Sequence, residues 1–96
     1  MSTFLDFNTT TGCLSFRGEL TIYEANVANE KLCQAFASGE LRQIDLAGVT
    51  ELDTAGLQIL VLARTLRTPA NEPVALVNYS DAVLEVLKLA GLEPTS

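Results

Sequence analysis

The sequence contains no histidine, and its 96 residues include only two cysteines. Without histidine, the chain lacks the commonest general base and the commonest metal ligand of proteins. Cys13 and Cys33 do not form the Cys-x-x-Cys spacing of zinc and redox sites, so we expect them to be packing residues rather than a redox pair. No glycine-rich phosphate loop is present, because the six glycines stand alone. These absences predict a protein that is not an enzyme and uses no metal or cofactor.

Positive charge is also scarce, which excludes further classes of partner. Six basic residues stand against twelve acidic ones, giving a net charge of −6, and the basic residues are spread singly along the chain. No cluster could neutralise a run of phosphates, so we expect neither nucleic-acid binding nor attraction to an anionic membrane.

Long apolar runs are missing as well. No segment approaches about 18 consecutive apolar residues, so no transmembrane helix and no direct membrane insertion are expected. The opening MSTFLDFNTT has neither the basic flank nor the apolar stretch of a signal peptide. We therefore expect a cytoplasmic protein with free thiols.

What remains is the composition of a compact globular domain. Hydrophobic residues make up 48% of the chain and charged residues 19%, which is too apolar for a disordered protein. The length predicts a single domain over residues 1–96, with enough chain to form one core.

Hydrophobic periodicity predicts strands that alternate with helices after an opening hairpin. Strands are expected at 3–7, 12–20, 41–48 and 73–78, and helices at 23–39, after Asp53, and at 80–91. The continuous apolar run at 73–78 is typical of a central strand covered on both sides. The order β-β-α-β-α-β-α predicts an α/β fold with a mixed, mostly parallel sheet of about four to five strands and helices packed on it.

The segment Asp53-Thr54-Ala55-Gly56 precedes an apolar helix, although glycine and threonine are poor helix formers. If Asp53 is the N-cap, its carboxylate accepts hydrogen bonds from the first turn and the Thr54 hydroxyl stays free for solvent. If Thr54 is the cap, its oxygen is engaged. We favour Asp53 as the cap, and we expect Gly56 to let another chain approach the backbone closely.

The helix after Asp53 is apolar on two sides. At 100° per residue, the expected core stripe consists of Ala55, Ile59, Leu62, Ala63 and Leu66. The opposite side holds Leu57, Leu60, Val61, Arg64, Thr65 and Arg67. Either a neighbouring helix covers the apolar residues of this second side, or some of them form an exposed patch that meets a partner beside Thr54.

A phosphate on Thr54 would lie at a helix N-terminus, where free N–H groups and the helix dipole favour anions. It would add about −1.5 to −2 charge at neutral pH, against some repulsion from Asp53. A partner surface built for a neutral hydroxyl would then lose contact. Asp-Thr before a helix is also common as simple capping chemistry, and the spacing alone favours capping over phosphorylation.

Residues 44–67, IDLAGVTELDTAGLQILVLARTLR, resemble the signature of STAS domains, the fold of bacterial anti-sigma-factor antagonists. The signature is an apolar strand, Asp-Leu-small-Gly, a short link, and Asp-Ser/Thr-Ala-Gly-Leu opening a helix. RGELTIYEA at 17–25 is similar to the approach to the family's first helix, and PVALVNYSDAVLEVLKLAGL at 73–92 to its last strand and helix. The likeness covers positions 10–92.

The resemblance implies a non-enzymatic switch protein that acts by partner switching in bacterial transcription regulation. In the antagonists, the residue at the Thr54 position is phosphorylated by an anti-sigma factor that is also a serine/threonine kinase of the histidine-kinase-like ATPase fold, and a phosphatase reverses the reaction. Asp53 would be the capping neighbour, and Asp45 would match an aspartate at the strand end near the phosphorylation site. The implied docking surface consists of Ala55, Gly56, Leu57, Val61 and Arg64.

Threonine at position 54 departs from the serine of most antagonists. It occurs in stressosome-type members, which are phosphorylated, and in a STAS subunit that docks on the ATPase of a phospholipid-transport ABC system. The stretch GELTIYEA is more similar to small STAS proteins of chemotaxis and two-component signalling. Kinase-regulated partner switching is the function we favour. Transporter docking and an unphosphorylated signalling scaffold stay open, as do the oligomeric state and the identities of kinase and phosphatase.

Overall fold

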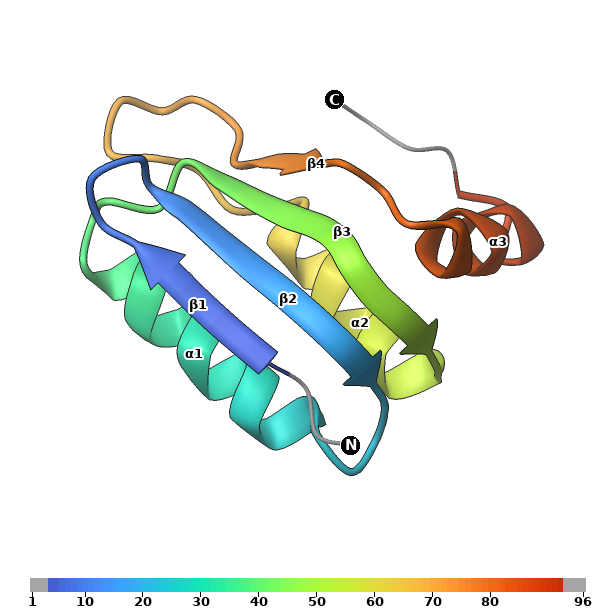
Figure 1. The fold of residues 1–96 in the computed structure, drawn as a ribbon. Coiled ribbons are helices and arrows are strands. Elements are labelled where there is room, and N and C mark those ends of the chain that lie inside the picture. Colours follow the sequence, from blue (N-terminus) through green and yellow to red (C-terminus); the bar gives the residue numbers. More distant parts are fainter. Residues whose placement is uncertain (1–3, 93–96) are drawn as a thin grey trace.

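A computed structural model describes residues 4–92 as one mixed sheet with three helices (Figure 1). The sheet has the spatial order β1-β2-β3-β4, with bounds Phe4–Asn8, Cys13–Leu20, Gln43–Leu52 and Ala75–Val77. β1 pairs with β2 as an antiparallel hairpin, and the pairs β2–β3 and β3–β4 are parallel. The predicted α/β class, the mixed sheet and the element order are confirmed.

The helices are α1 (Ala25–Ala37), α2 (Thr54–Ala63) and α3 (Asp81–Leu89). Figure 1 shows α1 and α2 side by side behind the sheet, and α3 beyond its β3–β4 side. As expected, Ser80 caps α3 by accepting a hydrogen bond from the Val83 N–H, and Gly91 follows the helix with a φ of 74°. No helix within residues 4–92 has the length and apolarity needed to cross a bilayer.

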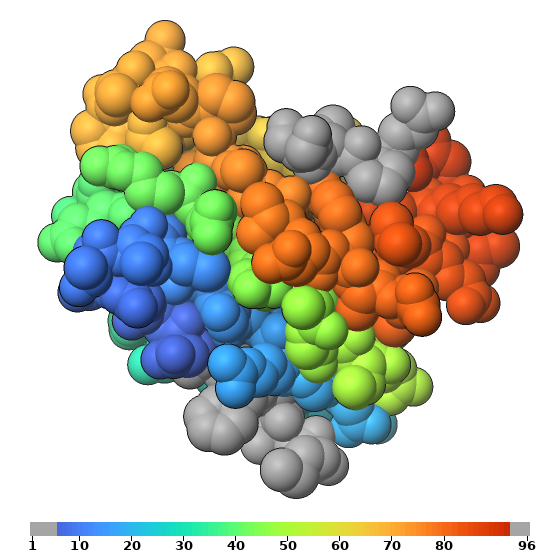
Figure 2. All heavy atoms as spheres, turned by 45° about the horizontal axis from the view of Figure 1, so that its top comes forward, coloured from blue at the N-terminus to red at the C-terminus, as the bar shows by residue number. Residues whose placement is uncertain are grey.

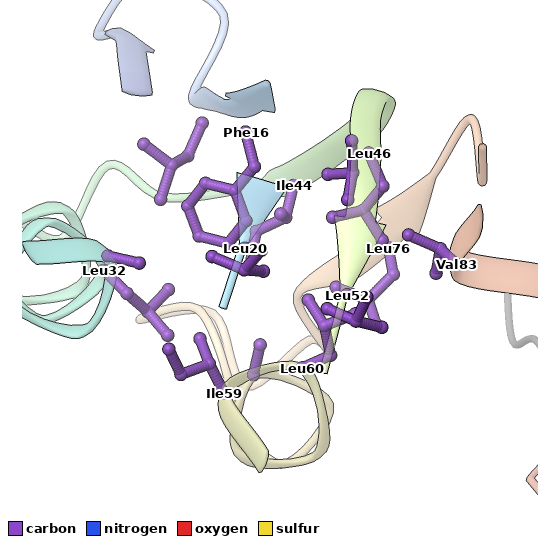
Figure 3. Packing of buried hydrophobic residues seen from close by; sticks show 14 of the residues in the cluster. Phe16, Leu20, Leu32, Ile44, Leu46, Leu52, Ile59, Leu60, Leu76 and Val83 are labelled. Carbon is purple, nitrogen blue, oxygen red and sulfur yellow. The ribbon is translucent and has the colours of Figure 1, made fainter. Parts of the chain in front are cut away.

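One hydrophobic core lies between the sheet and the three helices. The period-two pattern of β2 buries Leu14 and Phe16 and leaves Cys13 and Ser15 half-buried on the other side. Figure 3 shows that all three helices contribute side chains to this core: Leu32 from α1, Ile59 and Leu60 from α2, and Val83 from α3. Each fully buried leucine or phenylalanine contributes about 1.5–3 kcal/mol relative to exposure, so this cluster holds the helices against the sheet.

The expectation of a central strand at 73–78 is wrong. β4 spans only Ala75–Val77 and lies at the edge of the sheet, next to β3. The centre is taken by β2 and β3, because the opening hairpin occupies the other side of β2. The apolar run is explained by Val74 and Leu76, which are buried at this edge, and Figure 2 shows the segment lying between β3 and α3.

The expected end of the third strand at Gly48 is also wrong, because β3 continues to Leu52. Opposite it, β2 shifts register twice, between Ser15 and Arg17 and between Gly18 and Glu19. Gly48 pairs with Arg17, and a Cβ at position 48 would lie 2.6 Å from the Arg17 Cγ. The glycine therefore lets the strand pass Arg17 and end directly before Asp53, at the start of α2.

The predicted core stripe of α2 is partly wrong. Ile59 and Ala63 are buried as expected, but Leu62 is 46% exposed and Leu60 only 1%. Gly56 is buried as well, because it lies against the Leu20 carbonyl at the end of β2. That close contact turns the helix so that the side carrying Gly56 and Leu60 faces the sheet.

Candidate functional site

Asp53 is the N-cap of α2, as predicted, and it also holds a second segment of the chain. Its Oδ1 accepts a hydrogen bond from the Gly56 N–H at 3.0 Å, and its Oδ2 accepts one from the Ile22 N–H at 2.8 Å. Ile22 lies in the turn between β2 and α1. One carboxylate therefore fixes both the start of the helix and the neighbouring turn.

Thr54 is the first residue of α2, and its side chain is exposed. Because Asp53 occupies the cap, the Thr54 hydroxyl is not needed by the helix, and within residues 4–92 it has no hydrogen-bond partner. The arrangement presents a free alcohol at the positive end of a helix dipole.

The carboxylate of Asp53 is charged at neutral pH. Burial acts to raise its pKa, but hydrogen bonds from the N–H groups of Gly56, Ile22 and Ala55 together lower the pKa below its usual value. Stability from this group is present above the usual aspartate pKa and is lost as the pH falls through the lowered one. A negative charge thus stands next to Thr54 under physiological conditions.

Besides Asp53, a pair of carboxylates lies at the ends of β2 and β3. Glu19 and Glu51 are partners in the parallel register, one position before Leu20 and Leu52. The pKa of Glu51 is raised above its ordinary value. The causes, largest first, are a hydrogen bond with Glu19, the charge of Glu19, burial and the charge of Asp53. The side of the site toward the sheet is therefore acidic.

We expect Glu51→Gln to flatten the pH dependence of stability. Because the pKa of Glu51 is raised in the folded state, its ionisation destabilises the fold as the pH rises above the ordinary value of 4.5. The variant should match the wild type near pH 3.5 and be more stable at pH 7, as measured by urea midpoints across that range. The matched control, Glu85→Gln at an exposed position of α3, should keep the wild-type profile; equal profiles for both variants would contradict the role of the pair.

Gly56 does not have the place that was expected for it. It is buried, and a Cβ there would lie 2.2 Å from the Leu20 carbonyl oxygen and 2.6 Å from the Leu52 Cδ1. The backbone that approaches it closely belongs to this chain's own β2 strand and not to another molecule. Gly56 therefore positions Thr54 by letting α2 start against the sheet, and it offers no contact surface.

The other residues of the implied docking surface are spread along α2. Val61 is 42% exposed, on the side of the helix that carries Thr54, so it forms an apolar surface there. Leu57 is half-buried against the core, and half-buried Ala55 lines a shallow groove between α1 and α2. Of the two interpretations of the second side of the helix, exposure holds for Val61, whereas Leu57 is partly covered.

Two of the predicted site residues lie away from Thr54. Arg64 is half-buried at the C-terminal end of α2, about 15 Å along the axis at 1.5 Å per residue. Asp45 is in the first half of β3, seven residues before the strand ends, which is about 23 Å at about 3.3 Å per residue. It accepts hydrogen bonds from the Ala47 N–H and the Asn78 side chain. The expectation that Asp45 lies near position 54 is wrong because β3 continues well beyond it.

The turn between β2 and α1 was not among the predicted parts of the site. Ile22 and Tyr23 are 67% and 90% exposed in this turn, which the Ile22 N–H ties to Asp53. Two large apolar residues between a strand and the polar start of a helix were the available signal. Among the described residues, no three side chains of the histidine, cysteine, aspartate and glutamate types are grouped so that they could hold a metal ion.

The three helices and the four-stranded mixed sheet, in the order β-β-α-β-α-β-α, form the α/β architecture of a STAS domain. The chain belongs to the STAS family: residues 3–94 match the family model described as "Mlab, STAS domain". The resemblance inferred from the sequence is thereby confirmed.

A solved structure shares this fold. It is described as "Structure of the Anti-Sigma Factor Antagonist SpoIIAA in its Unphosphorylated Form", with a TM-score of 0.58 and 19% sequence identity, over 98% of this chain and 87% of that chain. At this identity the likeness concerns the fold. No curated protein matches the sequence.

Proposed function

We propose that the protein is a non-enzymatic signalling switch that binds a serine/threonine kinase of the anti-sigma-factor type and is controlled by phosphorylation of Thr54. The observation that carries the proposal is the exposed Thr54 hydroxyl, which is left without a partner because Asp53 caps the helix. The shared fold with an anti-sigma-factor antagonist supports it. A phosphatase would return the protein to its binding state.

The switch works through charge. The unphosphorylated surface offers a neutral hydroxyl and the exposed Val61, which a partner can cover at little desolvation cost. A phosphate would add about −1.5 to −2 charge beside the charged Asp53, and covering a dianion without a matched cation is strongly unfavourable. Release of the partner therefore requires no change of fold.

Incubation with the cognate kinase and ATP should add one phosphate per chain, located at Thr54 by intact-mass and peptide mass spectrometry. The kinases to test are those of the histidine-kinase-like ATPase fold encoded near this gene. Thr54→Ala should abolish the modification, because it removes the acceptor oxygen. Thr50→Ala, at an exposed threonine of β3, is the matched control and should be modified like the wild type. No phosphate with any of these kinases, or phosphate that persists in Thr54→Ala, would sink the proposal.

The second candidate is a docking subunit on the ATPase of a phospholipid-transport ABC system, a class of STAS protein in which threonine also occurs at the position of Thr54. It predicts a stable complex with that ATPase and no phosphate transfer to the chain. Thr54→Ala should leave such a complex intact, since a permanent contact does not depend on a modifiable oxygen. Co-purification of the wild type and the variant with the ATPase distinguishes the two functions.

A further inference from the structure

The strand β1 forms one edge of the sheet and is regular along its length. No strand within residues 4–92 lies on its outer side, and its register with β2 is continuous from Phe4 to Asn8 (Figure 1). Its sequence, FLDFN, contains no lysine and no proline, which commonly protect an edge strand from further pairing. The opposite edge is protected, because β4 has only three residues and is flanked by Pro73 and by Asn78 with a φ of 55°. The chain therefore leaves one edge open to an added strand.

The backbone groups of Phe7 point away from β2. The Asn8 carbonyl accepts a hydrogen bond at 2.8 Å from the N–H of Gly12, which directly precedes β2, so the backbone of Asn8 faces β2. Successive residues of a strand direct their N–H and C=O groups to opposite sides. The N–H and C=O groups of Leu5 and Phe7 consequently face outward, with the spacing that pairing to a further strand requires.

A groove of about 440 Å³ lies beside this edge, between β1 and α1. Phe7 is the register partner of the buried Leu14, so the two side chains share the face of the sheet that α1 covers. Together with Ala35 of α1 they give the groove an apolar floor, and Lys31 and Gln34 line it from the helix. A strand added to β1 would place every second side chain over this floor, where apolar groups fit.

The charge of Asp6 selects among the strands that could pair here. Asp6 is exposed and is the register partner of Ser15, on the face of the sheet opposite to Phe7. A second copy pairing antiparallel through the whole of β1 would place its own Asp6 directly opposite, and like charges in that position are destabilising. The net charge of −6 adds to the repulsion between copies. A strand that carries a cation opposite Asp6 gains an attraction instead.

We propose that β1 is a docking edge for an extended segment of another protein in which apolar residues alternate with arginine or lysine. The segment pairs with β1 as a further strand of the sheet. Its apolar side chains cover the groove, and its cations lie beside Asp6 on the other face. Lys31 opposes the reverse placement, because cations in the groove would meet a like charge.

The docking edge is distant from the candidate switch. Leu14 in the groove precedes Leu20, which lies against the start of α2, by six residues of β2, or about 20 Å at about 3.3 Å per residue. The segment can therefore stay bound whether Thr54 is phosphorylated or not. The inference adds a second binding function to the proposed one and does not rest on it.

The test uses a synthetic peptide of alternating valine and arginine, longer than β1 and blocked at both ends. Bound peptide should slow hydrogen exchange of the Leu5 and Phe7 amides at least about tenfold, since both become hydrogen-bonded. A peptide N-methylated at alternate residues, on the edge that would pair with β1, should bind at least about tenfold more weakly, because it lacks the donors. Glutamate in place of arginine should weaken binding similarly, because it repels Asp6.

Variants of the protein locate the site, with affinities measured by calorimetry. Asp6→Asn should weaken binding severalfold and reduce its salt dependence, whereas Glu85→Gln, on α3, should change both less. Gln34→Trp fills the groove from an exposed position and should weaken binding at least about tenfold. Its matched control, Cys33→Trp, is exposed on α1 outside the groove lining and should bind within about twofold of the wild type. Unfolding temperatures verify that the variants fold.

Absence of binding would overturn the inference, as would binding without slowed exchange at Leu5 and Phe7 or equal binding of the N-methylated peptide. A dimer of the protein alone that slows exchange of the same two amides would assign the edge to a second copy and would equally overturn it. Phosphate transfer to Thr54 is measured separately and needs no peptide. Failure of the docking edge therefore leaves the proposed function standing, and failure of the phosphorylation leaves the docking edge standing.

Discussion

Thr54→Glu is expected to weaken kinase binding at least about thirtyfold, or about 2 kcal/mol, while leaving the fold intact. The carboxylate adds a charge beside Asp53 that the partner would have to desolvate. Stability should not fall, because a negative charge in the first turn of α2 interacts favourably with the helix dipole. Calorimetry with the kinase and a thermal scan of the variant measure the two effects separately.

The control for this prediction is Thr54→Gln, which has the size of glutamate without its charge. If charge operates the switch, the glutamine variant should bind far better than the glutamate variant. Thr54→Ser keeps the hydroxyl and should bind and accept phosphate like the wild type. Equal losses for glutamine and glutamate would show that bulk at this position, rather than charge, blocks the partner.

Gly56→Val is expected to lower the free energy of unfolding by about 3 kcal/mol, the upper part of the range for overpacking a core. A Cβ at this position would lie 2.2 Å from the Leu20 carbonyl oxygen, so either α2 or the end of β2 must move. Because domains of this size are stable by only about 5–15 kcal/mol, the loss is large. Urea unfolding gives the free energy, and the NMR shift of the Ile22 amide reports whether its bond to Asp53 survives.

The matched control introduces the same residue elsewhere in the same helix. Gln58→Val is at an exposed position of α2, where valine costs only about half a kcal/mol in helix propensity. Gly56→Ala should fall between the two, since alanine is a better helix former than glycine by about 1 kcal/mol but still carries the offending Cβ. Equal stability of the two valine variants would contradict the close contact between Gly56 and β2.

The two expected results follow from one local arrangement. Gly56 lets the start of α2 approach the Leu20 carbonyl, and Asp53 then reaches both the Gly56 N–H and the Ile22 N–H. Thr54, between these two residues, is left to point outward. The exposed alcohol therefore depends on a glycine and an aspartate whose own contacts are internal, which explains how the binding and stability phenotypes of neighbouring positions can be separated.

Several features of the fold could be predicted because their causes are local. The strand patterns and the caps at Asp53 and Ser80 depend on residues within one or two turns, and these patterns fixed the element order. The family resemblance rests on a similarly continuous stretch around Asp53. The free hydroxyl at Thr54 follows from the choice of cap alone.

The missed features all depend on contacts between distant parts of the chain. Which side of α2 faces the core was decided by the meeting of Gly56 with Leu20, 36 positions earlier in the sequence. Gly48 pairs with Arg17 of β2, and β3 continues beyond this pair, past its predicted end. The continuation separates Asp45 from Thr54. No helical projection or strand pattern contains these pairings.

The sequence by itself determined the family, the order of elements and the identity of the capping residue, because periodicity and capping act over a few neighbouring residues. Only the tertiary structure decided that Gly56 is internal, that β4 is an edge strand, and that the Ile22 N–H is bonded to Asp53. Those outcomes depend on how closely two backbones can approach, and that distance is defined only once the strands and helices have packed.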